Sequence, residues 1–387
     1  MKNQTTINSL KKRSIVTAVS SACLFTAIGV QAGGTINFGE DKSITVGMGL
    51  RSSFSSVEDG APSGTSRSSD FSLDSIRLYV NSSLNKTIKG TFNTEKGADD
   101  EIKMLDAYAQ FEFSDAFNVW MGRMLPPSDR SNLDGPYYLS AWAYPGVVSQ
   151  YPAKFAGRDN GVNVWGKVLD KKLTYAVGVF EGHNNFIGAS SEDDNLLYAG
   201  RIQYDFWDSS LDPAYYTSST YYGSKNVLSV GMAAMYQKDG VGTAVAKGDY
   251  QSWNLDALLE KKLATGGALT VEAAYYNYDT GDTADVVSGF GGSTGTDNVG
   301  GLSQGTAYLA SAAYLLPQNV GAGKFQPYVR YQSFDNDLSK ITSSQNDVGV
   351  NYILNNHNAR ISATYSTNKA DNTKSLDRFV VGLQLQF

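Results

Sequence analysis

The sequence is nearly free of cysteine and histidine. Its one cysteine is Cys23, in a segment that we expect to be removed, so the mature chain can form no internal disulfide and no cysteine metal site. Its two histidines, His183 and His357, fall in a predicted external loop and a predicted tight turn. A serine hydrolase needs a histidine base oriented beside its nucleophile. The composition therefore argues against an enzyme and supports neither a metal centre nor a cofactor.

The N-terminal segment has the pattern of a signal peptide. Basic residues and no acids precede the apolar run Ile15–Val30, which has the length of a signal-peptide core and is short for a membrane helix. The small residues of "VQA" at 30–32 predict cleavage after Ala32, giving a signal peptide at residues 1–32 and a mature chain at residues 33–387. An uncleaved membrane anchor is the alternative.

Beyond residue 32 the chain also lacks a second long apolar run and a linker. Proline is scarce, with 9 residues against 39 glycines, and no shift in composition divides the chain, which predicts a single domain. If this domain enters a membrane, it must do so as a closed barrel, since only a barrel satisfies every strand hydrogen bond in lipid. Removing four basic residues leaves 32 − 4 = 28 basic against 38 acidic residues, a net charge of −10. This acidic balance argues against nucleic-acid binding.

What the mature chain does have is alternation of apolar and polar residues along many short segments. In Ser43–Arg51 and in the closing segment Arg378–Phe387, every second residue is apolar, which is typical of half-buried strands. Sixteen such segments are predicted, at residues 43–54, 71–84, 86–96, 102–113, 116–124, 159–169, 171–181, 195–207, 225–238, 248–262, 267–279, 303–316, 323–335, 344–355, 357–368 and 375–387.

The connections between these segments alternate between long and short. Residues 55–70 and 125–158 are long connections, and Asn85 and Asp170 are single-residue turns. Only the connection 208–224 is longer than expected for the side of the barrel on which it falls. An even number of strands with tight periplasmic turns and longer external loops is typical of an outer-membrane barrel. The sequence thus predicts an all-β, sixteen-stranded, transmembrane antiparallel barrel whose last strand closes against its first. A secreted β-sandwich is the alternative.

The strand faces opposite the apolar ones would line an aqueous lumen. The charged candidates for this lining have both signs, so the residues alone leave the preferred ion open. The basic candidates are Arg77, Lys89, Lys167, Arg201, Arg330, Arg360 and Arg378, and the acidic candidates are Glu95, Asp106, Glu112, Asp205, Asp256, Glu260, Glu272 and Asp347.

The longest connection, Met124–Gly161, is rich in proline and aromatic residues. These residues make a loop stiff and compact, so we expect this third external loop to fold inward and narrow the channel. A lid packed on the outer rim is the alternative. The constriction candidates are Asp129, Arg130, Asp134, Lys154, Arg158 and Asp159.

The segments around this loop resemble a known family. "LDAYAQFEFSDAFNVWMGRMLPPSDRSNL" followed by "FAGRDNGVNVWGKVLDKKLTYAVGVFEG" is similar to the phosphate-selective porin O and P family, with the specific match over about residues 75–207. The resemblance implies a Gram-negative outer-membrane channel of sixteen strands, a homotrimer with an inward third loop, and it suggests anion or phosphate transport.

The sequence as a whole favours a passive channel for small hydrophilic solutes or ions in the outer membrane, with lipid as its surroundings. Two alternatives stay open. One is an anion- or phosphate-selective channel. The other is a surface adhesin or structural barrel with a blocked lumen, for which the external loops leave room.

Overall fold

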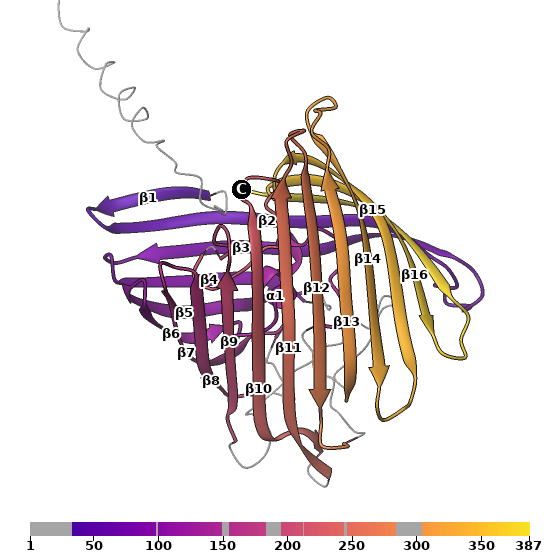
Figure 1. The fold of residues 1–387 in the computed structure, drawn as a ribbon, viewed down its shortest axis with the longest axis horizontal. Helices are drawn as coiled ribbons and strands as arrows, with labels where there is room; N and C mark the ends of the chain where they lie inside the picture. The colour runs from indigo at the N-terminus through magenta and orange to yellow at the C-terminus, as the bar shows by residue number, and fades with distance from the viewer. Residues whose placement is uncertain are drawn as a thin grey trace, which may run out of the picture. The chain divides into compact units, whose positions relative to one another are not determined.

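The computed structural model describes residues 33–97, 100–148, 155–182, 195–211, 213–243, 246–283 and 304–387. Strands dominate this part of the chain, and a single helix, α1 (Arg130–Tyr138), accompanies them (Figure 1). The strands are β1 (Gly33–Gly39), β2 (Lys42–Val57), β3 (Ser68–Ser83), β4 (Ile88–Lys96), β5 (Ile102–Ser114), β6 (Phe117–Met124), β7 (Asp159–Val168), β8 (Leu173–Phe180), β9 (Leu197–Asp205), β10 (Val227–Thr243), β11 (Ala246–Lys262), β12 (Ala268–Asp279), β13 (Gly305–Leu315), β14 (Lys324–Asn336), β15 (Thr342–Asn355), β16 (Ala359–Ala370) and β17 (Leu376–Gln386).

Strands β2 to β17 form a closed ring of antiparallel neighbours. The ring closes where β17 pairs with β2, in a register that runs from Arg378 opposite Val57 to Gln386 opposite Gly49. The final residue continues this ladder, because the Phe387 amide donates to the Met48 carbonyl at 2.9 Å. The sixteen predicted strands and the closure of the last against the first are confirmed.

One strand was not predicted. Strand β1 pairs with residues 42–47 of β2 as a short hairpin, and all of its residues are exposed. Its sequence "GGTINFG" has three glycines and only two apolar residues, so alternation gives too short a signal to detect it.

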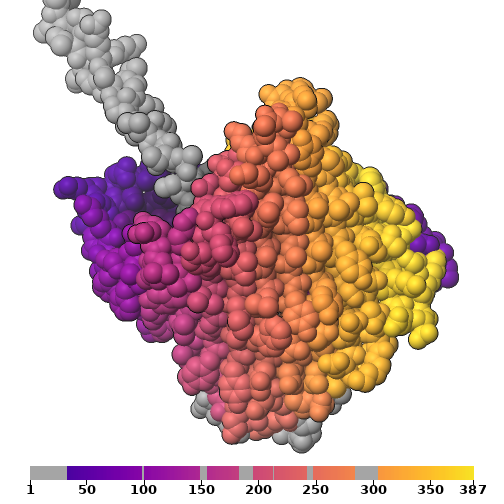
Figure 2. All heavy atoms as spheres, viewed as in Figure 1, coloured from indigo at the N-terminus to yellow at the C-terminus, as the bar shows by residue number. Residues whose placement is uncertain are grey.

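The ring has an apolar outer face and a polar inner face. Along β17 the outward side chains Phe379, Val381 and Leu383 are exposed, while the alternate residues Gln384 and Gln386 are buried. This alternation is that of a barrel whose outer band meets lipid. On the face that Figure 2 draws, side chains of consecutive strands from β10 to β14 form a continuous outer surface.

Aromatic side chains border the outer band. On β9 the exposed Tyr198 lies toward one end and Tyr204 toward the other, with exposed Ile202 between them. Tyr236 of β10 is exposed and pairs with Tyr198. Tyrosine is favoured at both membrane–water interfaces, so the middle of β9 lies near the centre of the apolar band.

The two ends of the barrel differ in their connections. The end that holds Phe387, here called the turn end, has short connections such as 115–116, 169–172 and 263–267. The opposite end, here called the loop end, has longer ones, among them 125–158. The connection Phe206–Asn226 is the exception at the turn end, as its length in the sequence indicates. Among the described residues, no helix is long and apolar enough to cross a membrane.

The outer band predicts how a charge on β9 affects stability. Ile202→Arg places a cation near the middle of the band, which should lower the free energy of unfolding by about 2–4 kcal/mol. Tyr198→Arg on the same strand face lies at the edge of the band and should cost only about 0–1 kcal/mol. Urea unfolding of both variants in lipid vesicles, followed by tryptophan fluorescence, measures the difference. Equal losses would show that the band is not placed as described.

Candidate functional site

The connection between β6 and β7, Leu125–Arg158, is described at residues 125–148 and 155–158 and is here called the long loop. Its helix α1 begins after Asp129, whose carboxylate accepts from the Asn132 amide at 3.0 Å as an N-cap. The helix breaks at Gly135, whose φ of 60° lies in the left-handed region, and the following Pro136. The N-cap and the break at Gly135 keep the helix short and the loop compact.

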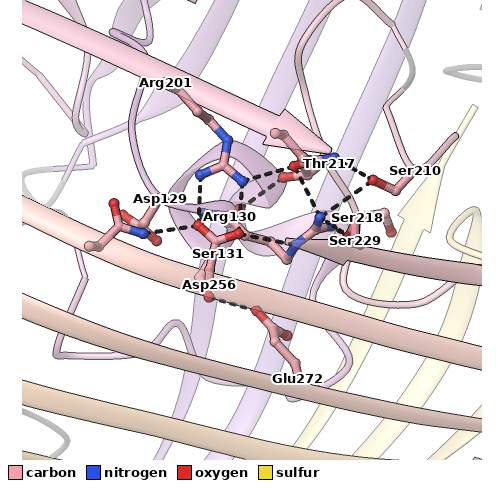
Figure 3. Close-up of polar contacts among 12 residues, drawn as sticks. Asp129, Arg130, Ser131, Arg201, Ser210, Thr217, Ser218, Ser229, Asp256 and Glu272 are labelled. Atoms are coloured by element: carbon pink, nitrogen blue, oxygen red, sulfur yellow. Dashed lines mark hydrogen bonds and ion pairs between the residues drawn. The ribbon is translucent and has the colours of Figure 1, made fainter. Parts of the chain in front are cut away.

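The start of the long loop bonds to polar side chains of β9 to β12 (Figure 3). Arg130 is fully buried and donates to Ser229 at 2.6 Å and to Gln203 at 3.1 Å. It also lies 3.6 Å from the carboxylate of Asp256. Next to it, Ser131 donates to Glu272 at 3.0 Å. This part of the loop therefore presents donors to an acidic stretch of the inner face.

Arg201 of β9 completes this group. Its two terminal nitrogens contact the two carboxylate oxygens of Asp256 at 2.6 and 2.8 Å, a bidentate pair. It also donates to the backbone carbonyl of Ser128 at 3.1 Å. Asp256 is thus shared between Arg201 on the wall and Arg130 in the loop. We call Arg130, Arg201, Asp256 and Glu272 the acidic-wall cluster.

The later part of the loop bonds to the opposite stretch of the ring, and there the roles are reversed. Side chains of β2 and of β14 to β17 donate to backbone carbonyls of the loop. The pairs are Arg51 with Trp142 at 2.6 Å, Arg330 with Ala143 at 2.7 Å, Asn351 with Ser140 at 2.8 Å, Arg360 with Leu139 at 2.5 Å, and Gln384 with Tyr137 at 3.0 Å. In these five bonds the loop supplies the acceptors and the wall supplies cationic and amide donors, whereas the Trp142 amide donates to the hydroxyl of Tyr328 at 3.2 Å.

Two glycines let aromatic rings of the loop approach this wall. A Cβ at Gly382 would lie 2.3 Å from the ring of Trp142, and one at Gly49 would lie 2.9 Å from Tyr137. Neither distance occurs between real side chains, so a larger residue would displace the ring. The guanidinium of Arg51 lies 4.0 Å from the centre of the Trp142 ring, a cation–π contact.

The arginines of this wall have few acidic neighbours. Arg51 and Arg360 are buried, and no ion pair joins either of them to a carboxylate among the described residues. Nitrogen atoms of both side chains are buried without a hydrogen-bond partner. We call Arg51 and Arg360 the basic-wall pair. The inner wall is therefore electrically divided. Strands β9–β12 contribute buried Asp205, Asp256, Glu260 and Glu272 against Arg201, whereas β2 and β14–β17 contribute buried Arg51, Arg330 and Arg360 against Asp347.

Burial changes the acidity of the loop carboxyls. It raises the pKa of Asp129 to about 7, against the opposing effect of the Asn132 amide. It also raises the pKa of Asp134 well above its ordinary range, with Glu272 adding to the effect. Asp129 therefore changes charge close to neutral pH.

The predicted site residues fall into separate groups. Asp129, Arg130 and Asp134 lie together in the long loop, and Arg201 joins Arg130 through Asp256. Elsewhere, Arg158 pairs with Asp106 at 3.2 Å, Arg77 with Glu95 at 2.5 Å, Lys89 with Glu112 at 2.5 Å and Arg330 with Asp347 at 2.7 Å. Asp159 accepts from the Asn160 amide at 2.7 Å, and Gln203 donates to Asp205 at 3.1 Å. Lys154 lies outside the described residues.

Arg51 of the basic-wall pair was not among the channel-lining residues predicted from the sequence. Arg51 ends the alternating segment Ser43–Arg51, off the face of its apolar residues, so the alternation itself could have placed it on the inner face. Its role depends on Trp142, which is distant in sequence. Asp256 and Glu272 were predicted to face the lumen, but their contacts with the long loop were not.

No group of three or more potential metal ligands occurs among the residues that the structure describes. His183 lies outside the described residues. His357 lies in the turn between β15 and β16, where its ring contacts the carbonyl of Thr220 at 2.9 Å and the hydroxyl of Ser218 at 3.2 Å. These contacts hold the half-buried ring of His357 against the connection between β9 and β10.

Comparisons with solved structures identify the same fold in outer-membrane proteins. An anion-selective porin from Comamonas acidovorans is 12% identical with a TM-score of 0.60, over 90% of this chain and 100% of that one. A loop L8 deletion mutant of OmpT from Vibrio cholerae is 11% identical with a TM-score of 0.57, over 90% and 100%. The outer membrane channel DcaP of Acinetobacter baumannii is 12% identical with a TM-score of 0.54, over 91% and 99%.

No curated protein matches the sequence. A family model, however, described as "Phosphate-selective porin O and P", matches residues 44–387, which include the whole ring apart from the first two residues of β2. The closed ring of sixteen strands, its polar inner face and this match together show that the chain belongs to the phosphate-selective porin O and P family.

Proposed function

We propose that this outer-membrane channel is a passive aqueous path for small hydrophilic solutes or ions, narrowed by the long loop. The observation that carries the proposal is the polar inner face, whose buried side chains bond to the loop from two separate stretches of the ring. A polar lumen is what a water-filled barrel requires. A solute moving down its own gradient needs no cofactor and no catalytic step.

The contacts of the loop support its position in the lumen. Its start bonds to β9–β12 and its later part to β14–β17 and β2. In a ring of sixteen strands, β11 and β17 are six places apart, so a segment that bonds to the inner faces of both must cross the opening. We infer that the loop divides and narrows the lumen there, with Asp129, Arg130 and Asp134 at the constriction.

The divided charge supports selection by the constriction. The buried wall acids of β9–β12, which outnumber Arg201, attract cations, while the basic-wall pair attracts anions on the other side of the loop. A solute that carries both signs, or a strong dipole, can be oriented between them. Selection of one ion by sign depends on which side of the loop conducts.

An anion path is the second candidate function. It is favoured by Arg51 and Arg360, because buried guanidinium nitrogens without partners are costly and a passing anion would satisfy them. The solved anion-selective porin of similar fold is consistent with such a path.

A blocked lumen, with a role in adhesion or structure, is the third candidate. It is favoured by the packing at the loop, where the cavity beside Asp129 and Asn254 has a volume of only about 20 Å³. That volume holds roughly one water molecule.

The proposed function also requires that the chain is exported and assembles in the outer membrane. Residues 1–32 would direct the chain out of the cytoplasm and be cleaved, leaving both barrel termini on the periplasmic side. We propose a homotrimer in the outer membrane. The OmpT of Vibrio cholerae, whose fold is similar, has been solved in a trimer form.

Conductance tests the function directly. The purified, refolded protein in a planar bilayer should give discrete open steps, because a polar lumen conducts ions. The reversal potential under a salt gradient then reports the preferred sign. A barrel that is verified as folded and gives no steps would contradict the channel and favour the blocked alternative.

The basic-wall pair makes a prediction about anions. The double variant Arg51→Gln/Arg360→Gln should reduce the permeability ratio of chloride to potassium by more than about fivefold, since each of the two charges at about 4 Å in water contributes about 1 kcal/mol, which alone is about fivefold. Reversal potentials measure this ratio. Lys171→Gln, at an exposed position in the turn between β7 and β8, is the control and should change it little. An unchanged ratio in the double variant would place the conducting path away from this wall.

Asp129 makes a prediction about pH. Because its pKa lies at about 7, raising the pH from 5 to 8 adds a negative charge and should increase cation permeability. The charged and titratable groups around it, Asp134, Arg201, Asp256, Glu272 and Tyr276, are the same in the variant. Asp129→Asn should therefore remove this change in reversal potential.

The same raised pKa has a consequence for stability. Asp129 keeps its proton in the docked loop up to a higher pH than in the unfolded chain. The stability that this protonated carboxyl contributes is therefore present at low pH and is lost as the pH rises through about 7.

The contradicting outcome for the permeability prediction is a pH dependence of the reversal potential that persists in Asp129→Asn. It would assign the titration to another group.

A further inference from the structure

The connection between β9 and β10, Phe206–Asn226, is unlike the other connections at the turn end. It is described apart from residue 212. Many of its side chains are buried, including Ser210, Tyr215 and the hydroxyl run Thr217–Thr220. In the other turns at this end, residues such as Lys171 are exposed to solvent. A run of buried hydroxyls in a turn must be bonded to something that covers it.

The wall of the barrel binds this connection through one carboxylate. Glu260 of β11, which is fully buried, accepts from the backbone amides of Tyr221 at 2.8 Å and Gly223 at 2.7 Å. It also accepts from the hydroxyl of Thr220 at 2.9 Å. Bonds from two amides and a hydroxyl to one charged group fix the segment against the inner face.

The long loop binds the same connection from the other end of the barrel. The hydroxyl of Thr217 donates to the Arg130 carbonyl at 2.9 Å, and the Ser219 amide donates to the Tyr138 carbonyl at 3.2 Å. In return, the Ser140 amide donates to the Ser219 hydroxyl at 2.7 Å. The two segments meet over α1, and Figure 3 shows Thr217 and Ser218 beside Arg130.

A third contact lies far around the ring. His357, in the turn between β15 and β16, contacts the carbonyl of Thr220, and its ring centre lies 4.7 Å from that of Tyr222. Strands β10 and β15 are five places apart in a ring of sixteen, so the connection reaches well across the opening. Desolvation of the ring, with Arg360 nearby, lowers the pKa of His357 to about 3.

We propose that residues Ser209–Lys225 form a second constriction, which enters the lumen from the periplasmic side and sets the size limit of the channel together with the long loop. This inference rests on the proposed channel function. The run Thr217–Thr220 carries no charge, and its hydroxyls are bonded within the protein. The second constriction therefore selects by size, whereas the long loop selects by charge.

The test is to shorten the connection. The β9–β10 pairing continues to Asp208, whose amide donates to the Asn226 carbonyl at 3.0 Å. Ser209–Lys225 can therefore be replaced by Asn-Gly, which suits a two-residue hairpin between paired strands. The control replaces Gln318–Ala322, the exposed part of the β13–β14 connection at the same end, with the same two residues. Both variants are first checked for folding by heat-modifiable migration in gels.

Single-channel conductance and the swelling of vesicles in sugars of increasing size are then compared. The shortened β9–β10 variant should conduct about twofold or more above the native protein, because the narrowest section limits the flow, and should admit larger sugars. The control should match the native protein. A conducting native protein with an unchanged shortened variant overturns the second constriction and leaves the channel function intact. If neither conducts, both proposals fail.

A cross-link tests whether the constriction is fixed. The hydroxyl oxygens of Ser140 and Ser219 lie 3.2 Å apart, and the chain has no cysteine after residue 32. Ser140→Cys/Ser219→Cys should form a disulfide between the two segments without changing conductance, since the segments stay together while the channel conducts. A conductance that falls on oxidation and returns on reduction would show that the segment moves aside, which contradicts a fixed constriction. The two single variants control for the substitutions themselves.

Discussion

The pairing of every strand on both edges is the constraint on which this structure depends. In lipid an unpaired backbone amide or carbonyl costs several kcal/mol, so a sheet that enters a membrane must close. Here the closure is the β17–β2 ladder, which continues through Phe387 to Met48. Closure in turn gives every strand one face toward lipid and one toward the lumen, and the alternation of the whole sequence follows from it.

A closed ring of this size encloses more space than its own side chains fill. We propose that the chain fills part of it with two connections, one from each end of the barrel. Each brings backbone groups into the interior, and these must be bonded. The wall supplies Arg51, Arg360 and Gln384 for loop carbonyls, and Glu260 for amides of the β9–β10 connection. The inner wall is therefore polar for a structural reason as well as for transport.

The ring could be predicted from the sequence because its information is local. Alternation marks each strand, and a one-residue slip would reverse its faces, so the sixteen segments were found with small errors at their ends. The short β1 lacks this signal. The site could be predicted only as a set of inward-facing charges. Which charges meet, such as Arg130 with Asp256 or Arg51 with Trp142, depends on how the long loop lies, and no local pattern encodes that.

The divided charge explains why net charge is a poor guide to this channel. The expected mature chain is acidic overall, yet Arg51 and Arg360 line one side of the loop with no ion pair to a carboxylate among the described residues. A permeating ion responds to the groups within about a Debye length, roughly 8–10 Å in physiological salt, and not to the sum over the chain. The family's association with anions and an acidic composition are therefore compatible, provided that the conducting path follows the basic wall.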